Sequence, residues 1–405
     1  MTGTTQHTST IGVLGGQWRA SVSATGGVEP WDGSAALDWF IAADDRWHIP
    51  SDEPTVRQRR IDGAPVIETR IKVPNGDAIH RVWCVADGGG YTVVEIENDS
   101  SLPFAVAFNR ADLLSSRPPA AVPIQGIELP EHSVVLPVGH KSTVRVALSH
   151  DAPAAGPLPE RLSSPMQVAR GWTAVIDAAG RMVLPDDGLL DRVAELRGEL
   201  ALNGPVEPDE DVIGFLVDVG QLVRLGERAD PWVPDVATAV ARAARLDPTW
   251  DSAAALDAAG VVLARAGETR ALRDLIRLRS TAPTSLPTAA PDGRELLWIE
   301  QRLARTVGIG TADLLGAGIP TAWLGANFEV YGLPIGPSTT VSYAVRWHGD
   351  RPAILWETEG PTVPLTASVI APEWSTAEPK GEALWPAPVG ASAITSMPTG
   401  DISFN

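Results

Sequence analysis

The stretch Thr340-Val-Ser-Tyr-Ala-Val-Arg-Trp347, followed by His348-Gly-Asp350 and Pro352-Ala-Ile-Leu-Trp-Glu357, indicates the fold most clearly. Apolar and polar side chains alternate in both arms, which is the period of a half-buried strand. The short segment between the arms contains a glycine and is typical of a turn. The stretch therefore predicts a β-hairpin, with His348 as a turn residue.

Tryptophan is concentrated around this hairpin, since five of the chain's 14 Trp residues lie in its last quarter. Large aromatic side chains on strands either fill a core or form a stacking surface for a ligand, and sequence separates the two poorly. We treat six residues of this region and of the preceding helical region as candidate ligand-binding residues: Trp250, Trp298, Trp323, Trp347, Trp356 and Glu357.

The first part of the chain, from Gly12 to about Val183, has the patterning of short strands. In Pro65-Val-Ile-Glu-Thr-Arg-Ile-Lys-Val73 the side chains alternate between an apolar and a charged side. Similar runs occur at 79–86, 91–97, 104–108, 133–137 and 143–148, and Gly171 to Asp177 has the composition of a further strand. Many short strands with polar turns predict an antiparallel β-sandwich.

The period changes after Pro185. Leu189, Leu190, Val193, Leu196 and Leu200 follow helical spacing, and Asp186 or Asp187 suits the N-cap. Further apolar runs with short connections predict about six antiparallel helices between residues 186 and 310. The apolar content of the segments 212–225 and 296–303 requires that they be covered by the flanking sheets or, as second choice, by a second copy in a homodimer.

These observations predict a multidomain α+β protein. The expected segments are a β-sandwich domain over 1–185, a helical hairpin domain over 186–310, a Trp-rich β-domain over 311–386 and a loose tail over 387–405.

Composition disfavours several classes of partner. The 405-residue chain is 44% hydrophobic and 20% charged, as in an ordinary globular protein, and its formal net charge is −18. That charge disfavours binding to nucleic acid and to anionic membrane surfaces. Cys84 is the only cysteine, so an intrachain disulfide is excluded, and its apolar surroundings predict a buried, inert thiol.

The start of the chain, Met1 to Gly16, has neither a basic segment nor a sustained apolar run, and no window approaches the ~20 apolar residues of a membrane span. We therefore expect a cytoplasmic protein. No metal and no cofactor are expected, because the histidines show no metal-ligand spacing and the nucleotide-binding and nucleophile-elbow motifs are missing. Gly139-His-Lys-Ser-Thr143 lacks the second glycine of a phosphate loop.

Carboxylates next to tryptophan are the remaining chemical candidates. Glycosidic bond hydrolysis needs two facing carboxylates, and Asp251 beside Trp250 and Glu300 beside Trp298 are the weak catalytic candidates. The alternative in each case is a tryptophan in the core beside an exposed acid.

The order of β-sandwich, helical hairpins and β-segment resembles the six-hairpin glycosidase superfamily, which includes glucoamylases, glycogen-debranching enzymes and rhamnosidases. The segments Val345 to Glu357 and Gly381-Glu-Ala-Leu-Trp385 are similar to the C-terminal region of actinobacterial proteins related to that group. The resemblance implies a shortened relative with an incomplete α/α toroid. It supplies no catalytic residue, because the acidic motifs of those enzymes have no counterpart here.

Three functions follow as hypotheses. The first is a carbohydrate-related protein that binds an oligosaccharide without hydrolysing it. The second is a protein-interaction scaffold built on the helices from 189 to 307. The third is an active glycoside hydrolase, so the sequence does not decide whether the chain is an enzyme.

Overall fold

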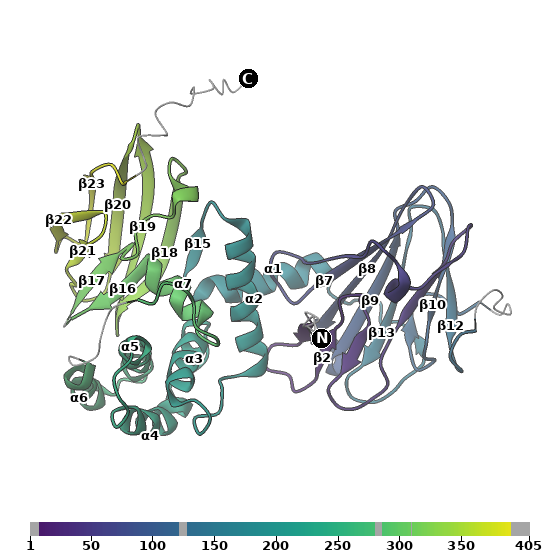
Figure 1. The fold of residues 1–405 in the computed structure, drawn as a ribbon. Coiled ribbons are helices and arrows are strands. Elements are labelled where there is room, and N and C mark those ends of the chain that lie inside the picture. The colour runs from purple at the N-terminus through teal and green to yellow at the C-terminus, as the bar shows by residue number, and fades with distance from the viewer. Residues whose placement is uncertain (1–7, 121–127, 280–285, 309, 390–405) are drawn as a thin grey trace, which may run out of the picture. The chain divides into compact units, whose positions relative to one another are not determined.

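The computed structural model describes residues 8–120, 128–279, 286–308 and 310–389 (Figure 1). The chain forms two compact units, Met1–Ala174 and Val175–Asn405. Within the described residues the fold is mixed α+β, with seven α-helices and several antiparallel sheets. The domain boundaries expected near residues 185, 310 and 386 stay predictions, and 390–405 of the expected tail lie outside the described residues.

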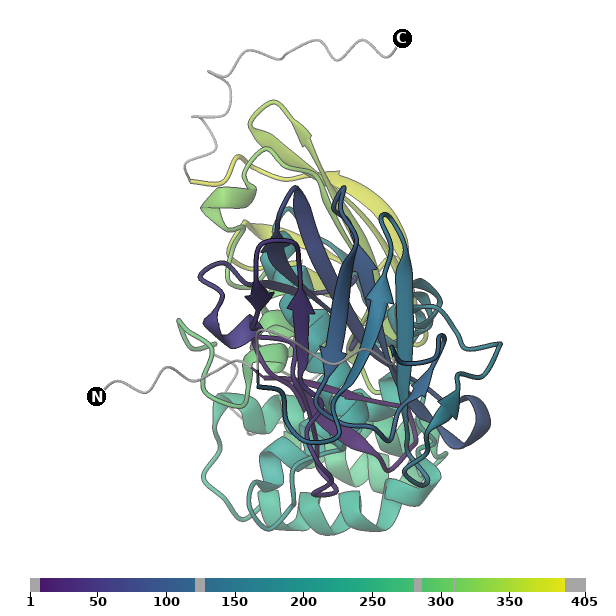
Figure 2. The same ribbon diagram turned by 90° about the vertical axis from the view of Figure 1, so that its right-hand side faces the viewer.

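The N-terminal unit contains β-sheets joined by short turns (Figures 1 and 2). A three-stranded sheet has the order β1-β2-β3, a four-stranded sheet β12-β10-β4-β5, and a seven-stranded sheet β14-β11-β13-β9-β8-β7-β6. The strands are β1 Ser9–Gly12, β2 Arg19–Val22, β3 Val28–Pro30, β4 Trp39–Ala42, β5 Trp47–His48, β6 Arg57–Arg60, β7 Ile67–Val73, β8 Gly76–Val85, β9 Tyr91–Asn98, β10 Phe104–Phe108, β11 Leu114–Ser115, β12 Val134–Val138, β13 Thr143–Ser149 and β14 Gly156–Pro157.

One hydrophobic cluster, drawn from all three sheets, forms the core of this unit. Strand β7 contributes one of its faces to this core, since Ile67 and Ile71 are fully buried in the cluster, as the alternation predicts. On the opposite face Glu68 is only 2% exposed, and it accepts from Arg59, Arg70 and Arg81. Burial raises the pKa of Glu68, but hydrogen bonds from the guanidinium groups, that of Arg81 first, outweigh it and leave the pKa below its usual value. Cys84 is buried as expected.

The strand expected at Gly171 to Asp177 is wrong, because these residues belong to helix α1, Pro165–Ala178. Its buried positions are Pro165, Ala169, Trp172 and Ile176, three and four residues apart, and this spacing puts them on one helical face. The helix has a reciprocal cap, in which Ser164 Oγ accepts from the Gln167 amide and the Gln167 side chain accepts from the Ser164 amide.

Six further α-helices lie in the described part of the C-terminal unit, in agreement with the number expected. They are α2 Asp187–Asn203, α3 Val212–Arg224, α4 Val233–Ala243, α5 Trp250–Arg265, α6 Thr269–Arg279 and α7 Glu295–Leu303. Asp186 is the N-cap of α2 and accepts from the Leu189 amide at 3.0 Å, as predicted. Short 3₁₀ turns occur at Pro50–Asp52, Asp87–Gly89, Asp230–Trp232 and Thr321–Trp323.

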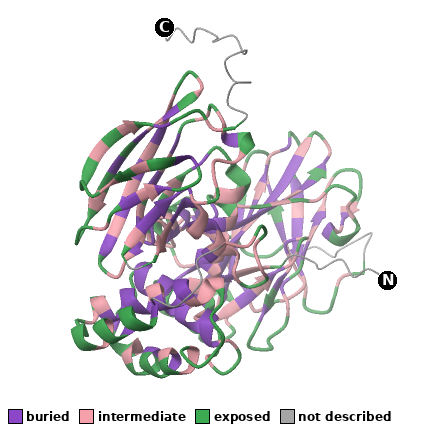
Figure 3. Ribbon diagram, turned by 60° about the vertical axis from the view of Figure 1, so that its left-hand side comes forward, coloured by how far each residue is buried: buried purple, intermediate pink, exposed green. Residues whose placement is uncertain are grey.

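Helix α3 is the centre of the helical region, since each of its residues except Asp218 is buried. Helices α4, α5, α6 and α7 pack with α3 in one hydrophobic cluster, while α4 leaves its outer side exposed (Figure 3). The expectation that the segment 296–303 is buried against a sheet is confirmed at Leu303, which belongs to the cluster of the C-terminal sheets. For the segment 212–225 the expectation is wrong, because helix α3 is covered mainly by other helices.

Two sheets enclose that second cluster. The five-stranded sheet has the order β15-β18-β19-β20-β23 and the four-stranded sheet β16-β17-β21-β22. The strands are β15 Arg181–Val183, β16 Ala304–Val307, β17 Thr311–Leu314, β18 Phe328–Gly336, β19 Thr339–His348, β20 Arg351–Glu359, β21 Leu365–Ala367, β22 Ala371–Thr376 and β23 Lys380–Leu384. The expected hairpin is confirmed as β19 and β20, with Trp347 opposite Pro352.

Strand β15 precedes the six helices in the sequence, yet it pairs with β18, which follows them: Arg181 lies opposite Tyr331. None of the helices in the described residues combines the length and the apolar character needed to cross a lipid bilayer.

Candidate functional site

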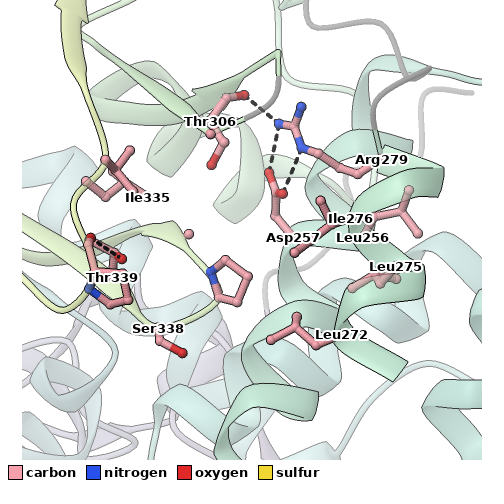
Figure 4. A pocket seen from close by; sticks show the side chains of 15 residues that line it. Leu256, Asp257, Leu272, Leu275, Ile276, Arg279, Thr306, Ile335, Ser338 and Thr339 are labelled. Atoms are coloured by element: carbon pink, nitrogen blue, oxygen red, sulfur yellow. Dashed lines mark hydrogen bonds and ion pairs between the residues drawn. The ribbon is translucent and has the colours of Figure 1, made fainter. Parts of the chain in front are cut away.

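A hollow of the C-terminal unit lies between α5 and α6 on one side and the turn from β18 to β19 on the other (Figure 4). We call it the helix–sheet cavity, and its volume is about 380 Å³. Its lining residues are Leu256, Asp257, Leu272, Leu275, Ile276, Arg279, Thr306, Gly310, Ile335, Gly336, Pro337, Ser338, Thr339, Pro361 and Val363. Small-molecule sites usually have volumes of roughly 300–1,000 Å³, so this cavity falls within their range.

One face of α6 supplies the apolar wall. Leu272, Leu275, Ile276 and Arg279 have the i, i+3, i+4, i+7 spacing that aligns side chains along a helix. Leu275 is buried, whereas Ile276 is 45% exposed and stands at the rim. The cavity is therefore connected to solvent.

The polar end of the cavity is an ion pair between Asp257 of α5 and Arg279 at the end of α6 (Figure 4). The Arg279 Nε donates to Asp257 Oδ1 at 2.9 Å and its Nη2 to Oδ2 at 3.0 Å. The guanidinium also donates to the carbonyl groups of Thr306 and Gly308. Burial raises the pKa of Asp257 although Arg279 lies against the carboxylate. This ion pair gives the otherwise apolar cavity one polar wall.

A smaller hollow of about 50 Å³, the polar chamber, shares Asp257, Thr306 and Gly336 with the helix–sheet cavity. Its other polar lining residues are Gln221, Arg224, Glu300 and Gln301. The side chains of Gln221, Arg224 and Glu300 are each at least nine-tenths buried.

Glu300 of α7 is the centre of a buried network. Arg197 donates to its Oε1 at 2.7 Å, and Arg224 donates to its Oε2 at 2.6 Å. Burial raises the pKa of Glu300, but the positive charges of Arg224 and Arg197 outweigh it, so the pKa lies below its usual value. Both oxygens are engaged and the carboxylate stays ionised. This is the opposite of what a general acid requires.

Gln221 is the remaining member of this network, and one of its two side-chain polar atoms has no hydrogen-bond partner among the described residues. Its Nε2 donates to Glu300 Oε2 at 2.7 Å, which fixes the orientation of the amide because the carboxylate can only accept. Gln221 Oε1 is buried and has no hydrogen-bond partner among the described residues. An acceptor of this kind is costly to leave unpaired.

A third hollow of about 250 Å³ brings together two of the candidate tryptophans, Trp298 and Trp323. Trp298 is half-buried, and the Arg302 guanidinium carbon lies 4.6 Å from its ring centroid. Asp186 and Leu189 also line this hollow. Trp323 is 5% exposed and packs edge-on against Phe328, so most of its ring belongs to the core.

The other candidate residues are dispersed. Asp251 lies in the first turn of α5, and its Oδ2 forms an ion pair with Arg294 Nε at 2.9 Å. It does not line the polar chamber, which Glu300 lines. Trp250 packs against the helical core. Trp347 Nε1 donates to the Ala326 carbonyl. Glu357 is exposed, and its Oε2 lies 3.6 Å from Lys380 Nζ.

Trp356 fills the core of the C-terminal sheets. It is 7% exposed and contacts Trp374 edge-to-face, with ring centroids 5.3 Å apart. Trp374 in turn contacts Trp385, whose indole is almost fully buried. Of the two roles open to these aromatic side chains, the structure assigns them the core.

Sequence reasoning missed Asp257, Arg279 and Gln221. The spacing of Leu272, Leu275 and Ile276 indicates a helical face but not what lies opposite it. The three polar residues come from different helices, and no local pattern joins them.

No protein-family model matches this chain, and no curated protein matches it. Among the described residues, no group of three or more His, Cys, Asp and Glu side chains is arranged to hold a metal ion.

Proposed function

We propose that the C-terminal unit binds a small, largely apolar molecule in the helix–sheet cavity. The observation that carries this proposal is the position of Leu272, Leu275 and Ile276 on α6. These side chains and Ile335 line opposite sides of a cavity of about 380 Å³. Protein interiors are normally close-packed, so apolar walls at this separation leave unused contact area. A ligand that fills the space removes this apolar surface from water, at about 25 cal/mol per Å².

The test is binding of 2-methylnaphthalene, followed by titration calorimetry and by the shift in thermal unfolding. Ile276→Trp puts a large side chain at the rim and is expected to abolish binding. Leu278→Trp is the matched control, because Leu278 lies on the exposed side of the same helix and does not line the cavity. If the wild-type protein does not bind the probe, or if Ile276→Trp binds it equally well, the proposal fails.

A second candidate is oligosaccharide binding at the hollow lined by Trp298 and Trp323. The half-buried ring of Trp298, with Arg302 stacked on it and Asp186 lining the same hollow, supports it, because sugars are held by an aromatic platform and flanking polar groups. The resemblance to six-hairpin glycosidases and the incomplete toroid stay predictions that agree with this candidate.

Titration calorimetry with maltooligosaccharides, glycogen and trehalose tests the second candidate. Trp298→Ala is expected to lower the affinity at least tenfold, whereas Trp31→Ala, at an exposed position of the N-terminal unit, is expected to leave it unchanged. The absence of heat with all three sugars contradicts it.

Hydrolysis through Asp251 and Glu300 finds no support in this geometry, since each carboxylate is held by arginine. An unchanged rate of glycoside hydrolysis in an Asp251→Asn/Glu300→Gln double variant would exclude a catalytic role for both residues. The interaction scaffold, the homodimer and a cytoplasmic location stay predictions.

A further inference from the structure

The polar chamber lies next to the helix–sheet cavity, because the two share Asp257, Thr306 and Gly336 as lining residues. The cavity is apolar and about 380 Å³, whereas the chamber is polar and about 50 Å³. The chamber beside the apolar cavity has the volume for one small head group.

The unpaired atom in the chamber residues is an acceptor. Gln221 is 4% exposed, its Nε2 is used by Glu300, and its Oε1 has no partner among the described residues. A head group that satisfies Oε1 must bring a hydrogen, and a carboxylate has none to offer at neutral pH.

The charges around the chamber disfavour a cationic donor. Arg197, Arg224 and Arg279 face the carboxylates of Glu300 and Asp257, so positive charge is in excess by one. A buried ammonium group would add to that excess and would lose its hydration as well. A neutral donor remains, and a hydroxyl is the smallest group that supplies one.

We propose that the ligand of this site is an apolar alcohol, whose body lies in the helix–sheet cavity and whose hydroxyl donates to Gln221 Oε1. This inference rests on the proposed function of the cavity. It adds the class of the ligand and assigns Gln221 as the residue that determines the specificity for it.

The test uses four probes with one apolar body: 2-naphthalenemethanol, 2-methylnaphthalene, 2-naphthylmethylamine and 2-naphthoate. We expect the alcohol to bind the wild-type protein at least as tightly as the methyl compound, and the two charged probes at least about tenfold more weakly than the alcohol. A site that is apolar throughout favours the methyl compound, because the alcohol must leave water without a new partner. Tighter binding of the methyl compound or of either charged probe therefore overturns the inference.

Gln221→Met removes the acceptor and keeps most of the volume. The ratio of alcohol to methyl affinity is expected to fall about five- to tenfold in this variant, the effect of one hydrogen bond. Gln17→Met, at an exposed position of the N-terminal unit that lines neither the cavity nor the chamber, is the matched control and is expected to keep the wild-type ratio.

The wild-type series stands on its own should Gln221→Met fail to fold. If none of the probes binds the wild-type protein, the proposed function fails. If the methyl compound binds tightest and Ile276→Trp blocks it, the cavity is a binding site and only the alcohol inference fails.

Discussion

A Cβ atom added to Gly220 of α3 would lie 2.6 Å from the Cβ of Ala258 of α5, and 3.0 Å from the Ala258 Cα. The two helices therefore approach each other backbone to backbone at this point. The neighbours of these residues in sequence, Gln221 and Asp257, both line the polar chamber. The close approach thus positions the two polar side chains on which the proposed site depends.

Gly220→Ala is expected to destabilise the protein by about 1–3 kcal/mol, because the added methyl group must push the helices apart. Gly198→Ala in α2 is the control, since a Cβ there meets no atom within 4 Å. It is expected to stabilise by up to about 1 kcal/mol through the better helix propensity of alanine. Urea unfolding measures both, and effects of equal sign would contradict the close approach.

Glu300→Gln is expected to cost about 3–5 kcal/mol, because it leaves Arg197 and Arg224 buried without their counter-charge. Glu295→Gln on the same helix breaks a pair with Arg192 in which both side chains are more than a third exposed, and it should cost less than about 1 kcal/mol. Comparable losses in the two variants would show that the Glu300 network is not a buried ion-pair cluster.

The same network predicts sensitivity to acid. The pKa of Glu300 in the folded protein lies below its ordinary value of 4.5. The carboxylate therefore contributes stability that is fully present above pH 4.5 and is lost as the pH falls through the folded pKa. Unfolding free energies measured from pH 7 to pH 3 should fall more steeply in the wild-type protein than in Glu300→Gln.

His80 of β8 gives a separate pH dependence in the N-terminal unit. It is 1% exposed and stacks on Trp39, and burial lowers its pKa to about 3. The unfolded chain takes up a proton below about pH 6.5 and the folded chain does not, so stability declines between about pH 6.5 and 3, by roughly 1.4 kcal/mol per pH unit. His80→Phe should remove this part of the decline, and an unchanged slope would contradict it.

Cys84 is expected to resist thiol reagents in the folded protein. Burial raises the pKa of its thiol to about 12, so the reactive thiolate is scarce at pH 8. Native protein should not react with a disulfide reagent, and one equivalent of thiol should appear on unfolding in urea. Rapid reaction of the native protein would show that the strand around Cys84 opens readily.

Local periodicity accounts for most of the elements that sequence predicts. The alternation at Ile67 to Val73 and at Thr340 to Glu357 reappears as β7 and as the hairpin of β19 and β20, because each strand has one side against a core. Helix α1, which periodicity did not predict, shows the limit of this approach. Its β-branched run suggested a strand, while Ser164 and Gln167, three residues apart, carried the capping signal that identifies a helix start.

The candidate site was much less accessible to sequence reasoning. Trp356 is in the core because Trp374 comes to lie against it from β22, and nothing near Trp356 in the sequence tells which role it takes. Asp257 and Arg279 come from different helices, and Gln221 and Glu300 likewise meet only when α3 packs against α7. Such pairs depend on tertiary packing, which short-range patterns do not encode.

The pairing of β15 with β18 also has a consequence for the order of events in folding. The chain must complete the whole helical segment before Arg181 can lie opposite Tyr331, so the edge of the five-stranded sheet is closed by a contact of very long sequence separation. Helices form from local contacts in microseconds, whereas such pairings carry a large loop-closure entropy and are slow. During synthesis β15 therefore stays unpaired until β18, which ends at Gly336, has been made. A chain released before that residue would leave β15 exposed to other molecules.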